Sequence, residues 1–350
     1  MKRVSSGDEF FMRRTFELAR LGAGFVSPNP MAGCVIVKDG AIVAEGYHKK
    51  FGGAHAEISA IKQAKSRQLT ADSMYINLEP CVHTDKKTPP CVPEIIRAGV
   101  TRVVVGMKDP NPAVAGRGIR ALRRAGIRVD VGVLEKESRE LNETYAKWIV
   151  TGRPFVLLKV AVTLDGALTL KKGTRSGFSS PESYAYVHEL RQLYDAIALG
   201  SESILIDNPL LTARRKGQRS RNPVRVIFDR RGRVQKSAKV FHEPGETLVF
   251  SSSLAAALRE LGRRGVMSVL VEGGAKLAQS FLRGRLVDKL MVTVTPQVAH
   301  DLNAPRFPFG YIRFSKSRWE IRGADAWFIG YLGMEKKSRA ERDKSWRGVH

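Results

Sequence analysis

The chain has 350 residues, 43% of them apolar, and a chain of this length is expected to form two domains. Its 59 Lys and Arg residues against 34 Asp and Glu give a formal net charge of +25, while 27% charged and 8% aromatic residues exclude global disorder. Three cysteines are too few for a disulfide framework, and no apolar run approaches the roughly 18 residues of a membrane span. The N-terminus also lacks the apolar core of a signal peptide, so we expect a cytoplasmic protein.

The first 150 residues alternate between helix and strand signals. Helices are predicted at 9–21, 55–64, 93–98, 116–125 and 134–150, and strands at 34–37, 42–45, 73–78, 102–107 and 127–133. Between the first two strands, Asp39-Gly40 indicates a two-residue hairpin turn. This alternation predicts an α/β sandwich with a partly parallel sheet.

The segment Thr151-Gly152-Arg153-Pro154 indicates a domain boundary, because Gly and Pro interrupt regular structure. We therefore expect a first domain at 1–150, a second at 151–335, and a basic, disordered tail at 336–350. In the second domain, strands are predicted at 155–162, 196–200, 224–228, 247–250, 268–271 and 290–295, and helices at 182–193, 254–263 and 276–282. A last strand at 326–332 is expected at the edge of its sheet.

The positive charge is densest between Arg214 and Lys239, where eleven basic residues accompany one acidic residue, Asp229. Such a stretch attracts phosphate groups, small or polymeric, although a solubilising surface is an equally simple explanation. Binding of single-stranded nucleic acid also needs aromatic side chains that stack on bases, and this stretch contains only Phe228. We therefore expect neither a nucleic-acid nor a membrane partner.

The strongest chemical signal is His55-Ala56-Glu57, followed by Cys81 and Cys91, each directly after a proline. One imidazole and two thiolates give a zinc ion three protein ligands and leave its fourth position open for water, as in catalytic zinc sites. Glu57 is then placed to carry the proton of that water to the leaving ammonia, as in zinc nucleobase deaminases. The simpler alternative is a core histidine near two buried free cysteines. Cys34, in a predicted strand, is expected to be inert core.

Longer motifs carry a resemblance to the bifunctional deaminase/reductase family of riboflavin biosynthesis. In the first half they are Ser27-Pro28-Asn29-Pro30, Gly53-Ala54-His55-Ala56-Glu57, Glu79-Pro80-Cys81, Thr88-Pro89-Pro90-Cys91 and Asp109-Pro110-Asn111-Pro112. In the second half they are residues 158–166, residues 207–212 and Val271-Glu272-Gly273-Gly274. The resemblance implies an N-terminal zinc cytidine-deaminase-like three-layer sandwich and a C-terminal dihydrofolate-reductase-like α/β domain.

The resemblance also implies the reactions and the residues of both sites. The reactions are hydrolytic deamination of 2,5-diamino-6-(5-phosphoribosylamino)pyrimidin-4(3H)-one and then reduction of its ribosyl side chain to ribityl with NADPH. The implied cofactor-binding residues are Ala161, Ser203, Asp207, Gly274, Ala275, Lys276, Leu277, Ala278, Gln279 and Ser280. The implied substrate-binding residues are Arg175, Arg191, Leu211, Arg214 and Glu272. A homo-oligomer is also expected.

Plainer interpretations exist for several of these residues. Asp207 before Asn208-Pro209 is also ordinary turn chemistry, Arg191 and Arg214 could be surface charges, and Gly273-Gly274 could be a tight strand-to-helix turn. A further run, 116–121, loosely matches a dinucleotide fingerprint, but it follows a Pro-rich loop, so we interpret it as the turn that begins a helix.

The chain departs from the family pattern at three places. Arg175 and Gly177 stand where the family has a serine and a tryptophan that packs on the cofactor. Residues 82–87 replace the family's Cys-Ser-His-x-Gly-Arg loop, with Lys86 and Lys87 able to take the place of the arginine on substrate phosphate. The turn at 296–300 also differs. The alternative functions are therefore a zinc deaminase with an inactive reductase domain and, less favoured, a nucleic-acid deaminase.

Overall fold

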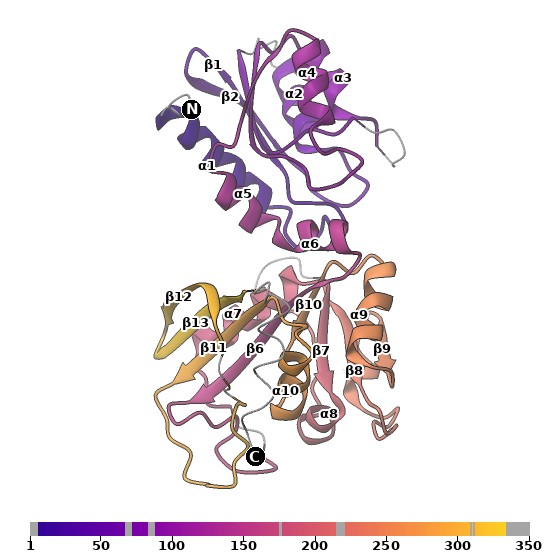
Figure 1. Cartoon of the computed structure of the whole chain (residues 1–350), viewed down its shortest axis with the longest axis vertical. Coiled ribbons are helices and arrows are strands. Elements are labelled where there is room, and N and C mark those ends of the chain that lie inside the picture. The colour runs from indigo at the N-terminus through magenta and orange to yellow at the C-terminus, as the bar shows by residue number, and fades with distance from the viewer. Residues whose placement is uncertain are drawn as a thin grey trace, which may run out of the picture. The chain divides into compact units, whose positions relative to one another are not determined.

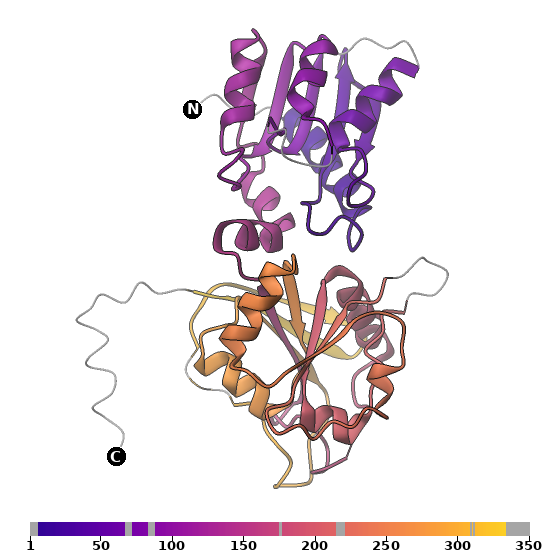
Figure 2. The same cartoon turned by 90° about the vertical axis from the view of Figure 1, so that its right-hand side faces the viewer.

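The computed structural model describes residues 6–66, 72–82, 88–174, 177–214, 221–308, 310 and 312–333 (Figures 1 and 2). The described residues form two β-sheets, one of five strands and one of eight. No helix within these ranges is both long and apolar enough to cross a membrane. The predicted tail at 336–350, the residues Lys86 and Lys87, and Arg175 lie outside the described residues.

The first sheet has the strand order β2-β1-β3-β4-β5. Its strands are β1 (Gly33–Lys38), β2 (Ala41–Tyr47), β3 (Ser73–Leu78), β4 (Arg102–Met107) and β5 (Arg128–Val131). β1 pairs antiparallel with β2 and β3, while β3, β4 and β5 run parallel, so the predicted partly parallel sheet is confirmed. The predicted hairpin turn is also present, because Asp39 and Gly40 both have positive φ angles, 49° and 77°.

Helices cover both faces of this sheet. They are α1 (Ser6–Arg20), α2 (Ala56–Ser66), α3 (Cys91–Arg97), α4 (Arg117–Arg124), α5 (Glu135–Leu141) and α6 (Glu143–Thr151). Alternate residues of each strand point to opposite faces: Cys34, Ile76 and Val105 pack with α2, α3 and α4, while Val35 and neighbouring side chains pack with α1. The expected three-layer sandwich follows directly from this alternation.

The single helix predicted at 134–150 is wrong, because the chain breaks there into α5 and α6. Asn142 stands between them with φ −111° and ψ 26°, outside the helical region. Its buried side chain accepts a hydrogen bond from Met31 N at 2.8 Å and donates one to Met31 O at 2.9 Å. This pairing with a distant peptide group favours the break over a continuous helix.

The second sheet has the strand order β12-β13-β11-β6-β10-β7-β8-β9. Its strands are β6 (Phe155–Thr163), β7 (Ala196–Gly200), β8 (Val224–Phe228), β9 (Thr247–Phe250), β10 (Ser268–Val271), β11 (Lys289–Thr295), β12 (Phe314–Arg322) and β13 (Asp325–Leu332). The helices are α7 (Pro181–Leu193), α8 (Ser201–Asp207), α9 (Leu254–Arg263) and α10 (Ala275–Arg283), with a short 3₁₀ turn η1 (Lys239–Phe241). The predicted strand at 326–332 exists, but it is not the edge strand, because the unpredicted β12 pairs along its outer side.

By the contacts between Cα atoms, the chain separates into two compact units. One consists of Met1–Phe155, Val187–Ala198 and Pro209–Leu270, and the other of Val156–Tyr186, Leu199–Asn208 and the described part of Val271–His350. This grouping assigns strands of the second sheet to both units. A boundary between residues 150 and 151 therefore stays a prediction.

Candidate metal centre and active site

His55, Cys81 and Cys91 converge at the carboxyl end of β3, although they come from three separate segments. His55 immediately precedes α2, Cys91 is the first residue of α3, and Cys81 follows β3 by three residues. His55 Nδ1 lies 3.6 Å from Cys81 Sγ and 3.2 Å from Cys91 Sγ, and the three ligand atoms all lie within 4.8 Å of one another. Both cysteines are buried and form no disulfide.

These separations suit a tetrahedral zinc ion. With Zn–N near 2.0 Å and Zn–S near 2.3 Å, tetrahedral angles require N···S separations of about 3.6 Å and an S···S separation of about 3.8 Å. The observed N···S distances lie within a few tenths of an ångström of that requirement. The donor set also favours zinc, because zinc binds imidazole and thiolate ligands, whereas magnesium and calcium bind oxygen ligands. The residues present therefore fit zinc.

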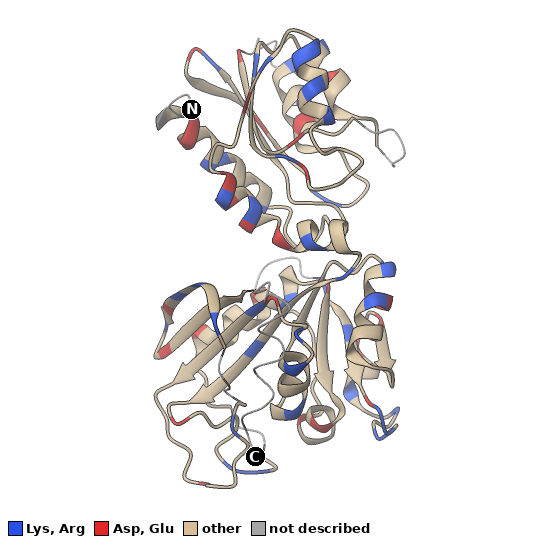
Figure 3. Cartoon of the chain, in the orientation of Figure 1, with Lys and Arg blue, Asp and Glu red and all other residues tan. Residues whose placement is uncertain are grey.

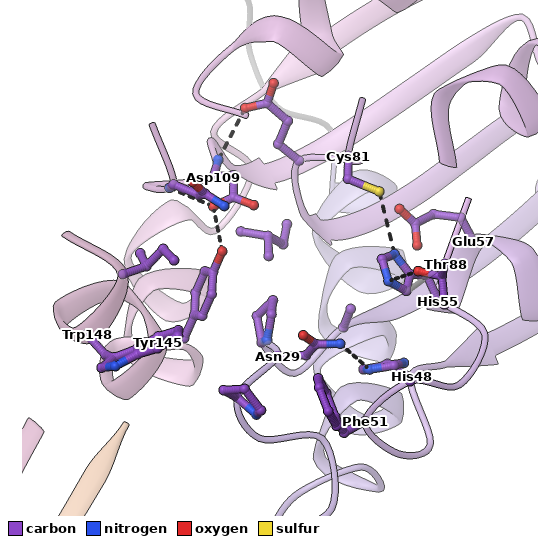
Figure 4. A pocket seen from close by; sticks show the side chains of 18 residues that line it. Asn29, His48, Phe51, His55, Glu57, Cys81, Thr88, Asp109, Tyr145 and Trp148 are labelled. Atoms are coloured by element: carbon purple, nitrogen blue, oxygen red, sulfur yellow. Dashed lines mark hydrogen bonds between the residues drawn. The ribbon is translucent and has the colours of Figure 1, made fainter. Parts of the chain in front are cut away.

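The second ring nitrogen of His55 has a partner as well. Its Nε2 lies 3.1 Å from the Thr88 hydroxyl oxygen (Figure 4). When Nε2 carries the ring proton and donates it to this hydroxyl, Nδ1 keeps its lone pair for a metal. The sequence analysis named Thr88 only as part of a motif. The one feature of the sequence that points to its contact with His55 is its position three residues before Cys91.

Glu57 lies beside this cluster, in the first turn of α2, and is only 4% exposed. Burial raises the pKa of its carboxyl group above the usual range, because the charged form loses its hydration. A carboxyl group in this environment accepts and returns a proton more readily than a solvated one. Cys34 lies in the same buried cluster as the two metal-binding cysteines, and burial raises the pKa of its thiol well above the usual value. That pKa favours the neutral thiol expected of inert core.

A pocket opens next to the cluster, and the side chains that line it are drawn in Figure 4. On one wall, Asn29 Nδ2 lies 3.0 Å from His48 Nε2, and His48 Nδ1 lies 2.9 Å from the carbonyl oxygen of Ala54. On another wall, the Tyr145 hydroxyl donates to Asp109 Oδ1 at 3.2 Å. The aromatic rings of Phe51, Tyr145 and Trp148 also line this pocket. The arrangement suits a flat, polar ring.

Asp109 is a second pocket carboxyl group, besides Glu57, whose pKa is raised by burial. Burial raises the pKa of Asp109 to about 6, against hydrogen bonds from Asn111 N and Tyr145 that lower it. Sequence reasoning placed Asp109 in a motif without assigning it a role. Its position two residues after β4, the parallel neighbour of β3, is what brings it to the same edge of the sheet as Cys81.

Of the predicted cofactor-binding residues, those at the starts of α8 and α10 lie close together. A side chain added at Gly274, which caps the N-terminus of α10, would meet the Ser203 hydroxyl at 3.8 Å. Lys276 Nζ, one residue into α10, pairs with Glu202 of α8 at 3.2 Å. Asp207 ends α8 and is followed by Asn208 with φ 40°, so it also forms part of a turn. Ala161 lies in β6.

The predicted substrate-binding residues differ in their surroundings and in their exposure. Arg191, in α7, donates to the Thr212 carbonyl oxygen at 3.4 Å, and Leu211 is buried with a φ of 54°. Arg214 is exposed, and Glu272 directly follows β10. Gly177, one of the departures from the family pattern, is exposed, and a side chain there would begin 3.0 Å from the hydroxyl of Tyr184. An aromatic ring therefore already lies beside the position where the family has tryptophan.

The helix-start interpretation of 116–121 is confirmed. Gly116 caps α4 in the left-handed region, with φ 82°. A Cβ at Gly118 would lie 2.1 Å from the Pro80 carbonyl oxygen, so only glycine allows this approach.

Comparisons with known proteins find a family match in the region of each of the two sheets. Residues 5–107 match the cytidine and deoxycytidylate deaminase zinc-binding region, and residues 154–324 match the RibD C-terminal domain. The chain is 38% identical over 314 residues to the riboflavin biosynthesis protein RibD of Aquifex aeolicus, covering 83% of this chain and 87% of that protein. It is 36% identical over 325 residues to RibD of Escherichia coli, covering 83% and 88%.

Solved structures are similar over nearly the whole chain. The diaminohydroxyphosphoribosylaminopyrimidine deaminase/5-amino-6-(5-phosphoribosylamino)uracil reductase of Thermotoga maritima superposes with a TM-score of 0.86 at 37% identity, covering 93% of this chain and 99% of that one. One crystal form of Acinetobacter baumannii RibD gives a TM-score of 0.85 at 32% identity, with the same coverage. The expected pairing of a cytidine-deaminase-like domain with a dihydrofolate-reductase-like domain is thereby confirmed.

Proposed function

The chain belongs to the bifunctional deaminase/reductase family of riboflavin biosynthesis, and we propose that residues 1–150 carry its deaminase site and residues 151–335 its reductase site. As a member of this family it is an enzyme with both activities. The first substrate is 2,5-diamino-6-(5-phosphoribosylamino)pyrimidin-4(3H)-one. The second step reduces the ribosyl side chain of the deaminated product to ribityl, with NADPH as the hydride donor.

The observation that carries the deaminase assignment is the convergence of three ligand atoms beside a buried carboxyl group. His55, Cys81 and Cys91 would hold the zinc ion, and Thr88 lies where it can fix the His55 ring through Nε2. A zinc ion bound there would supply a Lewis acid that lowers the pKa of water toward neutrality. The pocket at its open side gives the pyrimidine a place to lie.

Glu57 moves the protons of the reaction. Hydrolytic deamination adds the oxygen of water to the carbon that bears the amino group and releases that group as ammonia. The Glu57 carboxylate takes a proton from the attacking water and delivers it to the departing nitrogen, and its buried position keeps competing water away. Its raised pKa matches a group that must hold the proton between these two transfers.

The pocket walls orient the ring. Since Asn29 donates through its amide nitrogen to His48, its carbonyl oxygen is left to accept from an N–H group of the pyrimidine. The aromatic side chains of Phe51 and Trp148 offer flat apolar surfaces to the ring faces. The positive charge of the chain favours a phosphorylated substrate over a neutral one.

In the reductase half, the start of α10 is the proposed cradle for the cofactor phosphates. Backbone N–H groups at a helix N-terminus are unpaired within the helix and attract anions. The proposed cofactor-binding residues Ala161, Ser203, Asp207 and Gly274 to Ser280 lie on β6, α8 and α10. We also propose a homo-oligomer that acts in the cytoplasm, where a reducing environment keeps Cys81 and Cys91 available as thiolates.

One experiment tests both activities separately. Purified protein is incubated with the diaminopyrimidine, with and without NADPH, while ammonia release and NADPH oxidation are followed independently. We expect ammonia without NADPH, and NADPH oxidation only after deamination. Absence of ammonia release from zinc-loaded protein would contradict the deaminase assignment, and ammonia release without NADPH oxidation would contradict the reductase assignment.

A further inference from the structure

Glu79 is a buried carboxylate whose hydrogen-bond partners are all backbone amides. It lies between the end of β3 and Cys81 and is 3% exposed. Its Oε2 accepts from the N–H groups of Asp109 at 3.2 Å and Gly116 at 2.8 Å, and its Oε1 accepts from Ile119 at 3.1 Å. The described residues show no Lys or Arg paired with it. A buried carboxylate satisfied in this way holds backbone in place.

The three donors belong to one connected segment. Asp109 and Gly116 bracket the loop 109–116, and Ile119 lies in the first turn of α4. α4 has no side-chain cap of its own, because its N-cap residue is Gly116. Glu79, directly after β3, therefore caps α4 and supplies the negative charge that favours a helix N-terminus.

This explains the glycine spacing at 116 and 118 without a dinucleotide. Gly116 adopts a positive φ that turns its N–H toward the Glu79 carboxylate, and Gly118 allows α4 to approach the Pro80 carbonyl oxygen. The amide groups that would bind a phosphate in a nucleotide-binding turn bind an internal carboxylate here. The same contacts connect the segment before Cys81 to the loop that carries Asp109 and Asn111 into the pocket.

We propose that Glu79 is a positioning residue of the deaminase, which fixes the pocket loop 109–116 relative to the metal-binding segment and so sets affinity for the pyrimidine. The proposal rests on the deaminase function proposed above. Glu79 also lines this pocket, but it is not one of the three converging metal ligands and its carboxylate oxygens accept from backbone N–H groups. Its removal therefore acts on substrate binding through the loop that carries Asp109 and Asn111. Zinc binding is unaffected.

The test is the isosteric substitution Glu79→Gln. An amide has only one acceptor oxygen, so its NH₂ group must face at least one of the three backbone N–H groups. We expect KM for the diaminopyrimidine to rise at least about tenfold, with kcat within about threefold of wild type and one zinc per chain retained. Amide hydrogen exchange of peptides covering 109–119 should become faster. Glu79→Asp keeps the charge but shortens the reach, and we expect an intermediate KM.

Controls separate this role from a general loss of structure. Glu135→Gln changes an exposed glutamate paired with Arg139 and should leave KM and exchange unchanged. Reduction of the deaminated intermediate, measured on the same chain, reports whether the rest of the protein is intact. Faster exchange with an unchanged KM, unchanged exchange, or loss of zinc would each overturn the proposal. Absence of deamination by the wild-type chain would instead contradict the proposed function, while the exchange measurement would still decide whether Glu79 holds the loop.

Discussion

His55, Cys81 and Cys91 each occupy a place where the backbone changes direction, and this explains why residues 26 and 10 positions apart can meet. Two of them adjoin helix N-termini, where the positive end of the helix dipole favours a thiolate or an electron-rich ring nitrogen. The Cys91 backbone N–H also donates to Cys81 Sγ at 3.4 Å. Both thiols are therefore held ready to ligate a metal.

The first prediction concerns the metal. Cys91→Ala removes one of three protein ligands, and we expect zinc to fall below about a tenth of an equivalent per chain, because two ligands hold zinc far more weakly than three. Metal analysis of the purified variant measures this. Cys34→Ala is the matched control, since Cys34 is equally buried but is not among the three converging ligands, and it should keep one zinc. Full zinc occupancy in Cys91→Ala would show that the assignment is wrong.

The second prediction concerns the proton carrier. Glu57→Gln is nearly isosteric and should keep zinc, but deamination should fall by roughly a thousandfold or more, because both proton transfers lose their carrier. Zinc content and ammonia release are measured on the same preparation. A variant that kept more than about a tenth of the turnover, equivalent to a barrier change below about 1.4 kcal/mol, would exclude this role.

The metal ligands and Glu57 could be predicted from the sequence, but their supporting partners could not. Ligand chemistry restricts a zinc site to a few residue types, so His55, Cys81 and Cys91 stand out in a short list of candidates. Thr88 and Glu79 make their contacts with ordinary hydroxyl and carboxylate groups, which occur throughout any sequence. Only the tertiary structure shows that one faces His55 Nε2 and the other three backbone amides.

Elements with a buried face were predicted within a few residues, and elements without one were not. β3, β4 and β10 are runs of apolar and β-branched residues, and their predicted and observed bounds agree. β12 was missed because Trp319 and Ile321 are 62% and 73% exposed and charged residues alternate with them, so no apolar pattern marks it. α8 was missed because its apolar residues mark no single face: Ile204 is buried, while the adjacent Leu205 and Ile206 are 49% and 46% exposed.

The break between α5 and α6 gives the third prediction. Asn142→Ala deletes both hydrogen bonds to Met31 and leaves the partly buried Met31 N–H without that partner, so we expect the free energy of unfolding to fall by about 2 kcal/mol. Chemical denaturation monitored by tryptophan fluorescence is a suitable measurement, because Trp148 lies in α6. Asn142→Asp should destabilise at least as much, since a carboxylate oxygen would then face the Met31 carbonyl. An unchanged midpoint in both variants would contradict this account of the break.

Across the whole chain, the +25 charge is unevenly distributed (Figure 3). On one face of the first sheet, α2, α3 and α4 carry seven Lys and Arg residues against Glu94 and the buried Glu57. On the other face, α1 and α5 carry five basic and six acidic residues. The charge excess therefore belongs to particular layers. The layer that carries it here also contains Glu57 and Cys91, and His55 directly precedes its helix α2. Such a potential would speed the arrival of the proposed phosphorylated substrate.

Two activities in one chain should be separable by a single substitution in the second half. Gly274 has φ −69°, an ordinary value for any residue, and an added side chain would meet only the Ser203 hydroxyl, at 3.8 Å. The fold therefore tolerates a larger residue at this position. A bound cofactor would not tolerate it, because a phosphate held by the N-terminal amides of α10 must come within about 3 Å of the backbone.

The last prediction is that Gly274→Val weakens NADPH binding at least about tenfold while deamination stays within about twofold of wild type, because the added side chain occupies the proposed phosphate cradle and leaves the zinc site untouched. Titration of NADPH into each protein, followed by nucleotide fluorescence, gives the dissociation constants, and ammonia release gives the deaminase activity. NADH titrated in parallel shows whether the 2′-phosphate is recognised. Unchanged NADPH affinity in Gly274→Val would show that the cofactor phosphates do not bind at the start of α10. If the wild-type protein binds no NADPH at millimolar concentrations while deamination is intact, the departures at Arg175 and Gly177 have removed the reductase activity of this chain.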